Sequence, residues 1–141
     1  MFLLDTNVVS ELRKANAGRA DKFVVGWAST TPASTMYVSA ITVQELEIGA
    51  LLAERRDPAR GLVLRRWLEE QVLPAFGGRI LPVGPDVARR SAPLHVPDPR
   101  PVRDSLIAAT ALVHGMTVVT RNTADFAPMG VDLIDPWAPT E

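Results

Sequence analysis

The amino-acid sequence predicts an α/β fold in which a parallel sheet is flanked by helices on both faces. Short apolar runs alternate along the chain with longer segments of helical periodicity, which is the pattern of successive βαβ units. The run 116–119 is continuously apolar and too short for a helix, as is typical of a strand covered on both faces. The segment 106–113 before it is small and apolar on most sides, and Gly115 follows it, as expected of a core helix.

Taken in order, the chain begins with a strand at 2–4 that ends on Asp5 and leads into a helix. Further helices are expected at 20–29, 42–56, 60–73 and 85–94, and further strands at 36–41, 79–83 and 131–135. The strand at 79–83 contains Pro82 and therefore belongs at an edge of the sheet, where we also place the last strand. We expect one domain over 1–135, followed by a short C-terminal tail at 136–141.

The composition excludes several classes of protein. The 15 Lys and Arg residues are balanced by 16 Asp and Glu residues, so the chain is not coated in positive charge as many nucleic-acid binders are. It has no cysteine, which excludes disulfides and thiolate metal sites. The N-terminus has no basic region of a signal peptide, and no apolar stretch is long enough to span a bilayer. We therefore expect a cytoplasmic protein with no membrane partner.

Parallel strands joined by right-handed crossovers bring their carboxyl ends to one edge of the sheet. Four acids are expected at that edge: Asp5 after the first strand, Glu45 in the first turn of the helix after the second strand, Asp104 in the first turn of the core helix, and Asp125 after the strand at 116–119. Two carboxylates about 4 Å apart repel by about 4 kcal/mol at an effective dielectric constant near 20. Either a shared proton or a divalent cation held by oxygen ligands, Mg²⁺ or Mn²⁺, would offset that repulsion.

Each acid also has a purely structural interpretation. Asp5 fits a turn, Glu45 fits a capping box that begins at Thr42, Asp104 fits the positive end of a helix dipole, and Asp125 fits an exposed loop. The residue pattern alone leaves both interpretations open, because a motif becomes a site only in the right structural context.

Four segments carry a resemblance to a known family. They are 3–11 (LLDTNVVSE), 42–49 (TVQELEIG), 104–111 (DSLIAATA) and 120–126 (TRNTADF). In this order and at these distances they resemble the successive motifs of PIN-domain ribonucleases, and they are most similar to VapC/FitB-type toxins of bacterial toxin–antitoxin pairs. The resemblance covers nearly the whole chain. It implies a single Rossmann-like PIN domain, in agreement with the predicted order of strands and helices.

The resemblance also assigns roles to individual residues. It implies that Asp5, Glu45 and Asp104 are the catalytic acids that bind metal, and that Asp125 is the more variable fourth. Four neighbouring polar side chains match supporting positions of the family: Thr6, Asn7, Thr120 and Asn122. Arg121 either contacts a substrate phosphate or pairs with one of the acids.

The implied activity is that of an endoribonuclease, a hydrolase that cleaves RNA phosphodiester bonds with Mg²⁺, or alternatively Mn²⁺, as cofactor. One or two metal ions are both compatible with the sequence. The resemblance implies a cognate antitoxin as protein partner and, together with the apolar faces of helices 42–56 and 60–73, a homodimer. The alternative is a non-catalytic PIN-like binding module that acts through a protein partner. In that case the acids would bind arginine side chains of the partner.

Overall fold

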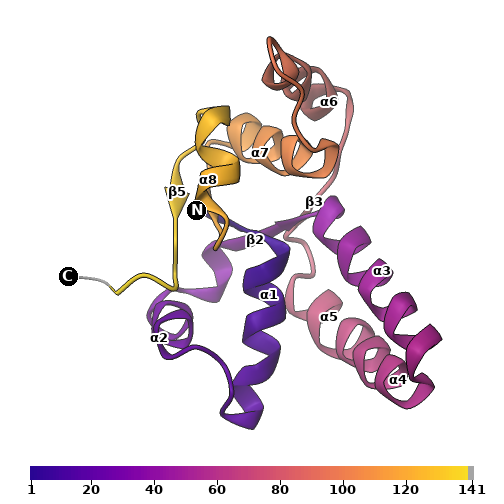
Figure 1. Ribbon diagram of the computed structural model, residues 1–141. Helices are drawn as coiled ribbons and strands as arrows, with labels where there is room; N and C mark the ends of the chain where they lie inside the picture. The colour runs from indigo at the N-terminus through magenta and orange to yellow at the C-terminus, as the bar shows by residue number, and fades with distance from the viewer. Residues whose placement is uncertain (140–141) are drawn as a thin grey trace.

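The computed structural model describes residues 1–139, and within them five parallel strands form one sheet (Figure 1). The strands are β1 (Phe2–Leu4), β2 (Met36–Ser39), β3 (Ile80–Leu81), β4 (Thr117–Val119) and β5 (Leu133–Ile134). Their order is β3-β2-β1-β4-β5, with Leu3 opposite Tyr37 of β2 and Val118 of β4. The predicted parallel α/β fold is thereby confirmed, and the strands predicted at 79–83 and 131–135 do lie at the two edges.

Helices connect successive strands. The α-helices are α1 (Thr6–Arg13), α2 (Lys22–Thr30), α3 (Ala40–Arg56), α4 (Pro58–Trp67), α5 (Leu73–Ala75), α6 (Pro85–Ser91), α7 (Val102–His114) and α8 (Thr123–Phe126). Shorter helical turns are η1 (Lys14–Ala17), η2 (Ala33–Thr35), η3 (Leu68–Val72), η4 (Ala92–His95) and η5 (Ala127–Met129). Among the described residues, none of these helices has both the length and the apolar character needed to cross a bilayer.

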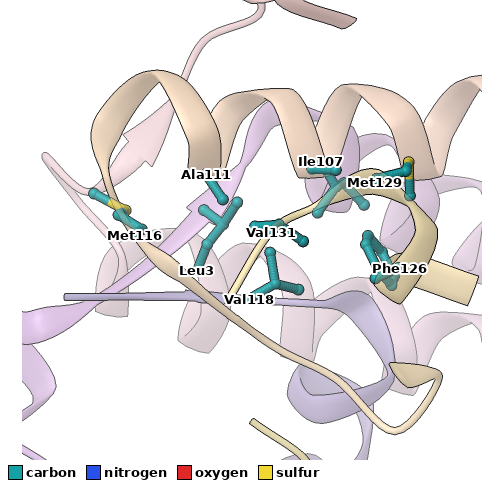
Figure 2. Close-up of a cluster of buried hydrophobic side chains, with 9 residues drawn as sticks. Leu3, Ile107, Ala111, Met116, Val118, Phe126, Met129 and Val131 are labelled. Atoms are coloured by element: carbon teal, nitrogen blue, oxygen red, sulfur yellow. The ribbon is translucent and has the colours of Figure 1, made fainter. Parts of the chain in front are cut away.

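Successive side chains of a strand point to opposite faces of the sheet, so an apolar strand needs helices on both faces to cover it. Leu3 and Leu4, both fully buried, belong to two different apolar clusters. Leu3 belongs to the same buried cluster as Val118, Ile107 of α7 and Phe126 of α8 (Figure 2). The second cluster joins Leu4 to these buried residues of the strands, α1, α3 and η3: Val8, Val9, Met36, Val38, Leu46, Leu68, Val72 and Val119. The prediction of helices on both faces is therefore confirmed.

The junction between β2 and α3 differs from the sequence prediction. The sequence predicts a strand that reaches residue 41 and a capping box that starts the helix at Thr42. The structure ends β2 at Ser39, whose Oγ accepts a hydrogen bond of 3.0 Å from the Ile41 amide and so caps a helix that begins at Ala40. Both predictions are wrong, and Glu45 consequently lies in the second turn of α3 and not in the first.

The end of the core helix is as predicted. Helix α7 ends at His114, and Gly115 adopts φ 65°, in the left-handed region that favours glycine. The predicted tail at 136–141 falls partly outside the described residues. Within the described part, Trp137 is half-buried and packs against the second apolar cluster, and its amide donates to Asp135 Oδ1 at 2.9 Å.

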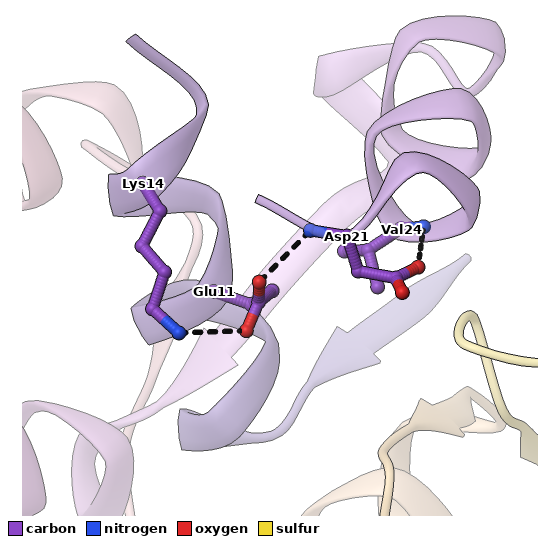
Figure 3. Close-up of polar contacts among 4 residues, drawn as sticks. All are labelled: Glu11, Lys14, Asp21 and Val24. Atoms are coloured by element: carbon purple, nitrogen blue, oxygen red, sulfur yellow. Dashed lines mark hydrogen bonds and ion pairs between the residues drawn. The ribbon is translucent and has the colours of Figure 1, made fainter. Parts of the chain in front are cut away.

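A small polar network fixes α1 against α2 (Figure 3). The Glu11 carboxylate accepts a hydrogen bond of 2.9 Å from the Asp21 amide and one of 3.2 Å from Lys14 Nζ. Asp21 in turn caps α2 by accepting from the Phe23 and Val24 amides. The amide hydrogen bond, with help from Lys14, lowers the pKa of Glu11. The network therefore favours the ionised carboxylate and holds the polar turn between the two helices.

Gly61 is required by the close packing of α4 on α3. A Cβ at this position would lie 2.4 Å from the Cα of Glu54, a backbone atom that cannot easily move. We predict that Gly61→Ala destabilises the protein by about 1–3 kcal/mol, as is typical of overpacking. Gly26→Ala is the matched control, because Gly26 lies in the middle of α2 with nothing within 4 Å of the added atom. It should stabilise the protein by about 0.5–1 kcal/mol. Urea denaturation measures both changes, and similar effects of the two substitutions would contradict the packing of α4 as the cause.

Candidate active site

The candidate site lies where the chain order of the sheet reverses, at the ends of β1 and β4. Asp5 directly follows β1 and Thr120 directly follows β4, and both are buried. Asp5 Oδ2 accepts a hydrogen bond of 2.7 Å from Thr120 Oγ1 and a longer one of 3.3 Å from Asn7 Nδ2. Asp5 Oδ1 accepts from the Thr6 amide at 2.8 Å. Such switch points are where open parallel sheets bind their ligands.

The Asp5 carboxylate is held in an unfavourable environment for a negative charge. Only 6% of Asp5 is exposed. Burial raises the pKa of Asp5, while the hydrogen bonds from Thr120 and Thr6 lower it and the charges of Glu45 and Asp125 raise it further; the net direction is upward. A neighbouring cation would therefore stabilise the ionised form of Asp5.

Glu45 reaches the site from α3 although it lies one turn deeper in the helix than predicted. Its Oε1 accepts a hydrogen bond of 2.7 Å from Thr6 Oγ1, so the residue after Asp5 joins the first two acids. Its Oε2 lies 3.9 Å from a guanidinium nitrogen of Arg103. No role is predicted for Arg103 from the sequence. Its position directly before Asp104 is the one feature of the sequence that could have indicated a contact with the acids.

Asp104 is the third residue of α7, half-buried at the end of the helix that faces the sheet edge. Its side chain accepts no hydrogen bond from the described residues 1–139, which distinguishes it from Asp5 and Glu45. Burial raises the pKa of Asp104, and the negative charges of Asp5, Glu45 and Asp125 raise it further, against a smaller opposite effect of Arg103.

Asp125, by contrast, is exposed in the first turn of α8, and its charge acts on Asp5 and Asp104 from the rim of the site. Asn122 is also exposed, and its amide donates to Thr120 Oγ1 at 3.0 Å.

Arg121 lies beside the acids without pairing with them. Its amide donates to Asn7 Oδ1 at 3.3 Å, and its guanidinium carbon lies 5.2 Å from the centre of the Trp137 ring. No carboxylate of residues 1–139 comes within 4.0 Å of the Arg121 guanidinium. The salt bridge considered for Arg121 is instead made by Arg103 with Glu45.

The donor set at this site suits a hard divalent cation. Its side chains offer carboxylate oxygens, and the Asp104 oxygens accept no hydrogen bond from the described residues that would compete. Within residues 1–139, no three histidine, cysteine, aspartate or glutamate side chains are grouped tightly enough to coordinate one ion directly. A cation at this site would therefore need water among its ligands or a movement of the acids toward one another.

Comparison with known proteins defines the class. The family model described as "PIN domain" matches residues 2–130. The chain is 42% identical to VapC ribonuclease Y4jK of Sinorhizobium fredii, with 99% of each chain covered, and 40% identical to Toxin FitB of Neisseria gonorrhoeae, with 97% of this chain and 99% of the other covered. The chain therefore belongs to the PIN-domain family, and within that family to the group of VapC- and FitB-type toxins.

Solved structures agree with this assignment. The crystal structure of FitAcB from Neisseria gonorrhoeae superimposes with a TM-score of 0.87 at 37% identity, covering 97% of this chain and 99% of the other. A toxin-antitoxin complex from Klebsiella pneumoniae superimposes with a TM-score of 0.66 at 27% identity, covering 96% and 98%. The PIN fold implied by the sequence motifs is thus confirmed over nearly the whole chain.

The raised pKa of Asp104 predicts the direction of a stability change. The folded state binds a proton at Asp104 more tightly than the unfolded state, so stability is lost as the pH rises from the ordinary carboxyl range through the raised pKa. At neutral pH without metal, Asp104→Asn should therefore be as stable as the native protein or more stable, and the difference should vanish at acidic pH. Denaturation at several pH values in EDTA measures this. If Asp104 served only the helix dipole, neutralisation would instead cost about 0.3–1 kcal/mol.

Proposed function

We propose that the protein is a metal-dependent endoribonuclease and the toxin of a toxin–antitoxin pair. The observation that carries the proposal is the position of Asp5, Glu45 and Asp104 at the switch point of the sheet, where burial and, to a smaller extent, mutual repulsion raise the pKa of Asp5 and Asp104. Relatives named as ribonuclease and toxin share this family and support the choice of RNA as substrate.

The roles of the side chains follow from their contacts. Thr6 orients Glu45 through its hydroxyl and Asp5 through its amide, so a single residue sets the spacing of two acids. Thr120 and Asn7 fix the second oxygen of Asp5. Asp104, which has no hydrogen bond among the described residues, is free to turn toward a ligand. Asp125 at the rim would complete a second metal position or orient the attacking water.

Mg²⁺ or Mn²⁺ is the cation that these oxygen donors would hold, through Asp5, Glu45, Asp104 and, at the rim, Asp125. When bound, such a cation lowers the pKa of a coordinated water and neutralises charge that develops on the phosphate oxygens. Arg121, whose guanidinium lies over the Trp137 ring, would contact a phosphate of the RNA.

Cleavage of a susceptible RNA tests the proposal. Asp104→Asn should lower activity by more than the roughly 10- to 100-fold that follows loss of a residue supporting a metal ligand. Thr6→Val removes the hydroxyl that donates to Glu45 and contacts Thr42 Oγ1 at 3.4 Å, and its loss of activity should fall within that range. Asp132→Asn is the matched control. Asp132 is exposed and lies directly before β5, at the amino ends of the strands, whereas the candidate site lies at their carboxyl ends. This variant should retain full activity.

Two outcomes would refute the enzyme proposal. One is undiminished cleavage in excess EDTA, because the acids would then have no cation to hold. The other is the absence of cleavage by the native protein in both Mg²⁺ and Mn²⁺. This second outcome would favour the alternative, a non-catalytic PIN-like module that acts through a protein partner.

Two partners follow from the same proposal. A cognate antitoxin is supported by the similarity to FitAcB and to the toxin-antitoxin complex from Klebsiella pneumoniae. A homodimer is supported by apolar side chains left exposed on α3 and α4: Ile48, Leu51, Leu52 and Leu62. An exposed apolar patch of this kind on a small domain marks an interaction surface.

Assembly can be measured directly. Sedimentation of the toxin alone should give the mass of a dimer, and Leu52→Asp, which places a charge in the apolar patch, should shift it to the monomer. Co-expression with the product of the neighbouring gene should give a co-purifying complex without ribonuclease activity. A native monomer at micromolar concentration would refute the dimer, and a fully active enzyme recovered from the co-expression would refute the antitoxin.

A further inference from the structure

A groove leads away from the candidate active site along α1. A cavity of about 210 Å³ is lined by Thr6 and Glu45 at the site and extends to Arg13 and Trp67. Two larger cavities, of about 450 Å³ and 680 Å³, are also lined by Arg13. The three cavities are therefore neighbours on one surface and meet at Arg13.

The two larger cavities form what we name the basic groove. Its charged lining consists of five cations, Arg13, Lys14, Arg19, Arg60 and Arg66, and of two carboxylates, Asp57 and Glu70. Five positive charges less two negative charges give the lining a net charge of +3. The whole chain has a net charge of −1, so this surface concentrates positive charge that the chain as a whole does not carry.

Most of these cations have no acidic partner. Within residues 1–139, ion pairs closer than 4.0 Å involve Lys14, Arg65 and Arg103, and none involves the four arginines of the basic groove. Lys14 is paired with Glu11 (Figure 3). Arg13 lies over the ring of Trp67, with 5.9 Å from its guanidinium carbon to the ring centre.

The adjacent arginines Arg65 and Arg66 show the contrast. Arg65 is hydrogen-bonded to Glu47 of α3 and thereby ties the two helices together. Arg66 instead lines the groove. Arg65 therefore has a structural role, whereas Arg66 remains available to a ligand.

We propose that the basic groove binds the phosphates of the RNA strand on one side of the cleaved bond. The proposal rests on the ribonuclease function proposed above. Guanidinium groups without carboxylate partners bind phosphate bidentately. From Thr6 to Arg13 the axis of α1 rises about 10 Å at 1.5 Å per residue, a distance that several consecutive phosphates of one strand span. The acids would hold the cation at the cleaved phosphate, and the arginines would hold the phosphates that follow.

Binding in EDTA tests this proposal, because no cleavage then contributes to the signal. A short fluorescent single-stranded RNA of mixed sequence is titrated with the protein at several salt concentrations, and anisotropy reports binding. The R19E/R66E variant reverses two charges of the groove, and R19K/R66K keeps both charges. The R89E/R90E variant makes the same change in charge at exposed positions of α6, which does not line the groove.

The expected result is a weaker dependence on salt in R19E/R66E alone. For single strands, the slope of log K against log salt falls by about 0.7 for each phosphate that the protein no longer neutralises, hence by about 1.4 for two. At about 0.1 M salt this corresponds to roughly 25-fold weaker binding. R19K/R66K and R89E/R90E should keep the native slope.

Several results would overturn the proposal: undetectable binding by the native protein, equal slopes for native and R19E/R66E, or an equal loss in R89E/R90E. If R19E/R66E keeps its RNA affinity and loses only the co-expressed antitoxin, the groove binds a protein and not RNA. Cleavage by the native protein with Mg²⁺ or Mn²⁺ is measured separately. A native protein that cleaves while R19E/R66E keeps the native slope refutes the groove alone, whereas one that does not cleave refutes the proposed function.

Discussion

The burial of one carboxylate at the end of the central strand is the constraint on which the site depends. The chain leaves β1 toward β2 on one side and returns to β4 on the other, so the end of β1 faces the switch point. Leu4 before Asp5 and Thr120 across from it are fully buried, and water therefore has little access to the carboxylate. Hydrogen bonds from the Thr6 amide and from the side chains of Asn7 and Thr120 replace those that water would make to the carboxylate. Because burial outweighs these bonds, the pKa of Asp5 stays raised and the site favours additional positive charge.

The other acids meet the same repulsion in different ways. Glu45 is relieved by the Thr6 hydroxyl and by the guanidinium of Arg103. Asp104 has no such donor among residues 1–139, and burial together with the charges of Asp5, Glu45 and Asp125 raises its pKa. The free protein therefore stores electrostatic repulsion at one position that a ligand can relieve. Binding a cation there would convert a local cost of folding into a gain, since whatever binds only the folded state stabilises it.

The sequence predicts the positions of the acids better than it predicts their contacts. Asp5 could be placed at the sheet edge because an apolar run ends abruptly there, and strand ends of a parallel sheet meet at one edge. The start of α3 could not be placed correctly, because the β-branched residues Ile41, Thr42 and Val43 favour a strand while the single cap at Ser39 decides for a helix. The contact of Arg121 with Trp137 joins residues that no periodicity relates, so only the fold reveals it.

Distance explains how acids and arginines share one surface without cancelling each other. In physiological salt, exposed charges farther apart than about 8 Å are largely screened from one another. Arg13 lies about 10 Å along the axis of α1 from Thr6, and Arg19 follows after a further turn of chain. Neither Arg13 nor Arg19 is among the charges that shift the pKa of Asp5 or Asp104, whereas Arg103 lowers the pKa of Asp104 and lies 3.9 Å from Glu45. An RNA strand differs from a single dissolved ion, because its phosphates are linked. One strand can therefore contact the acids of the candidate site and the arginines of the basic groove at the same time.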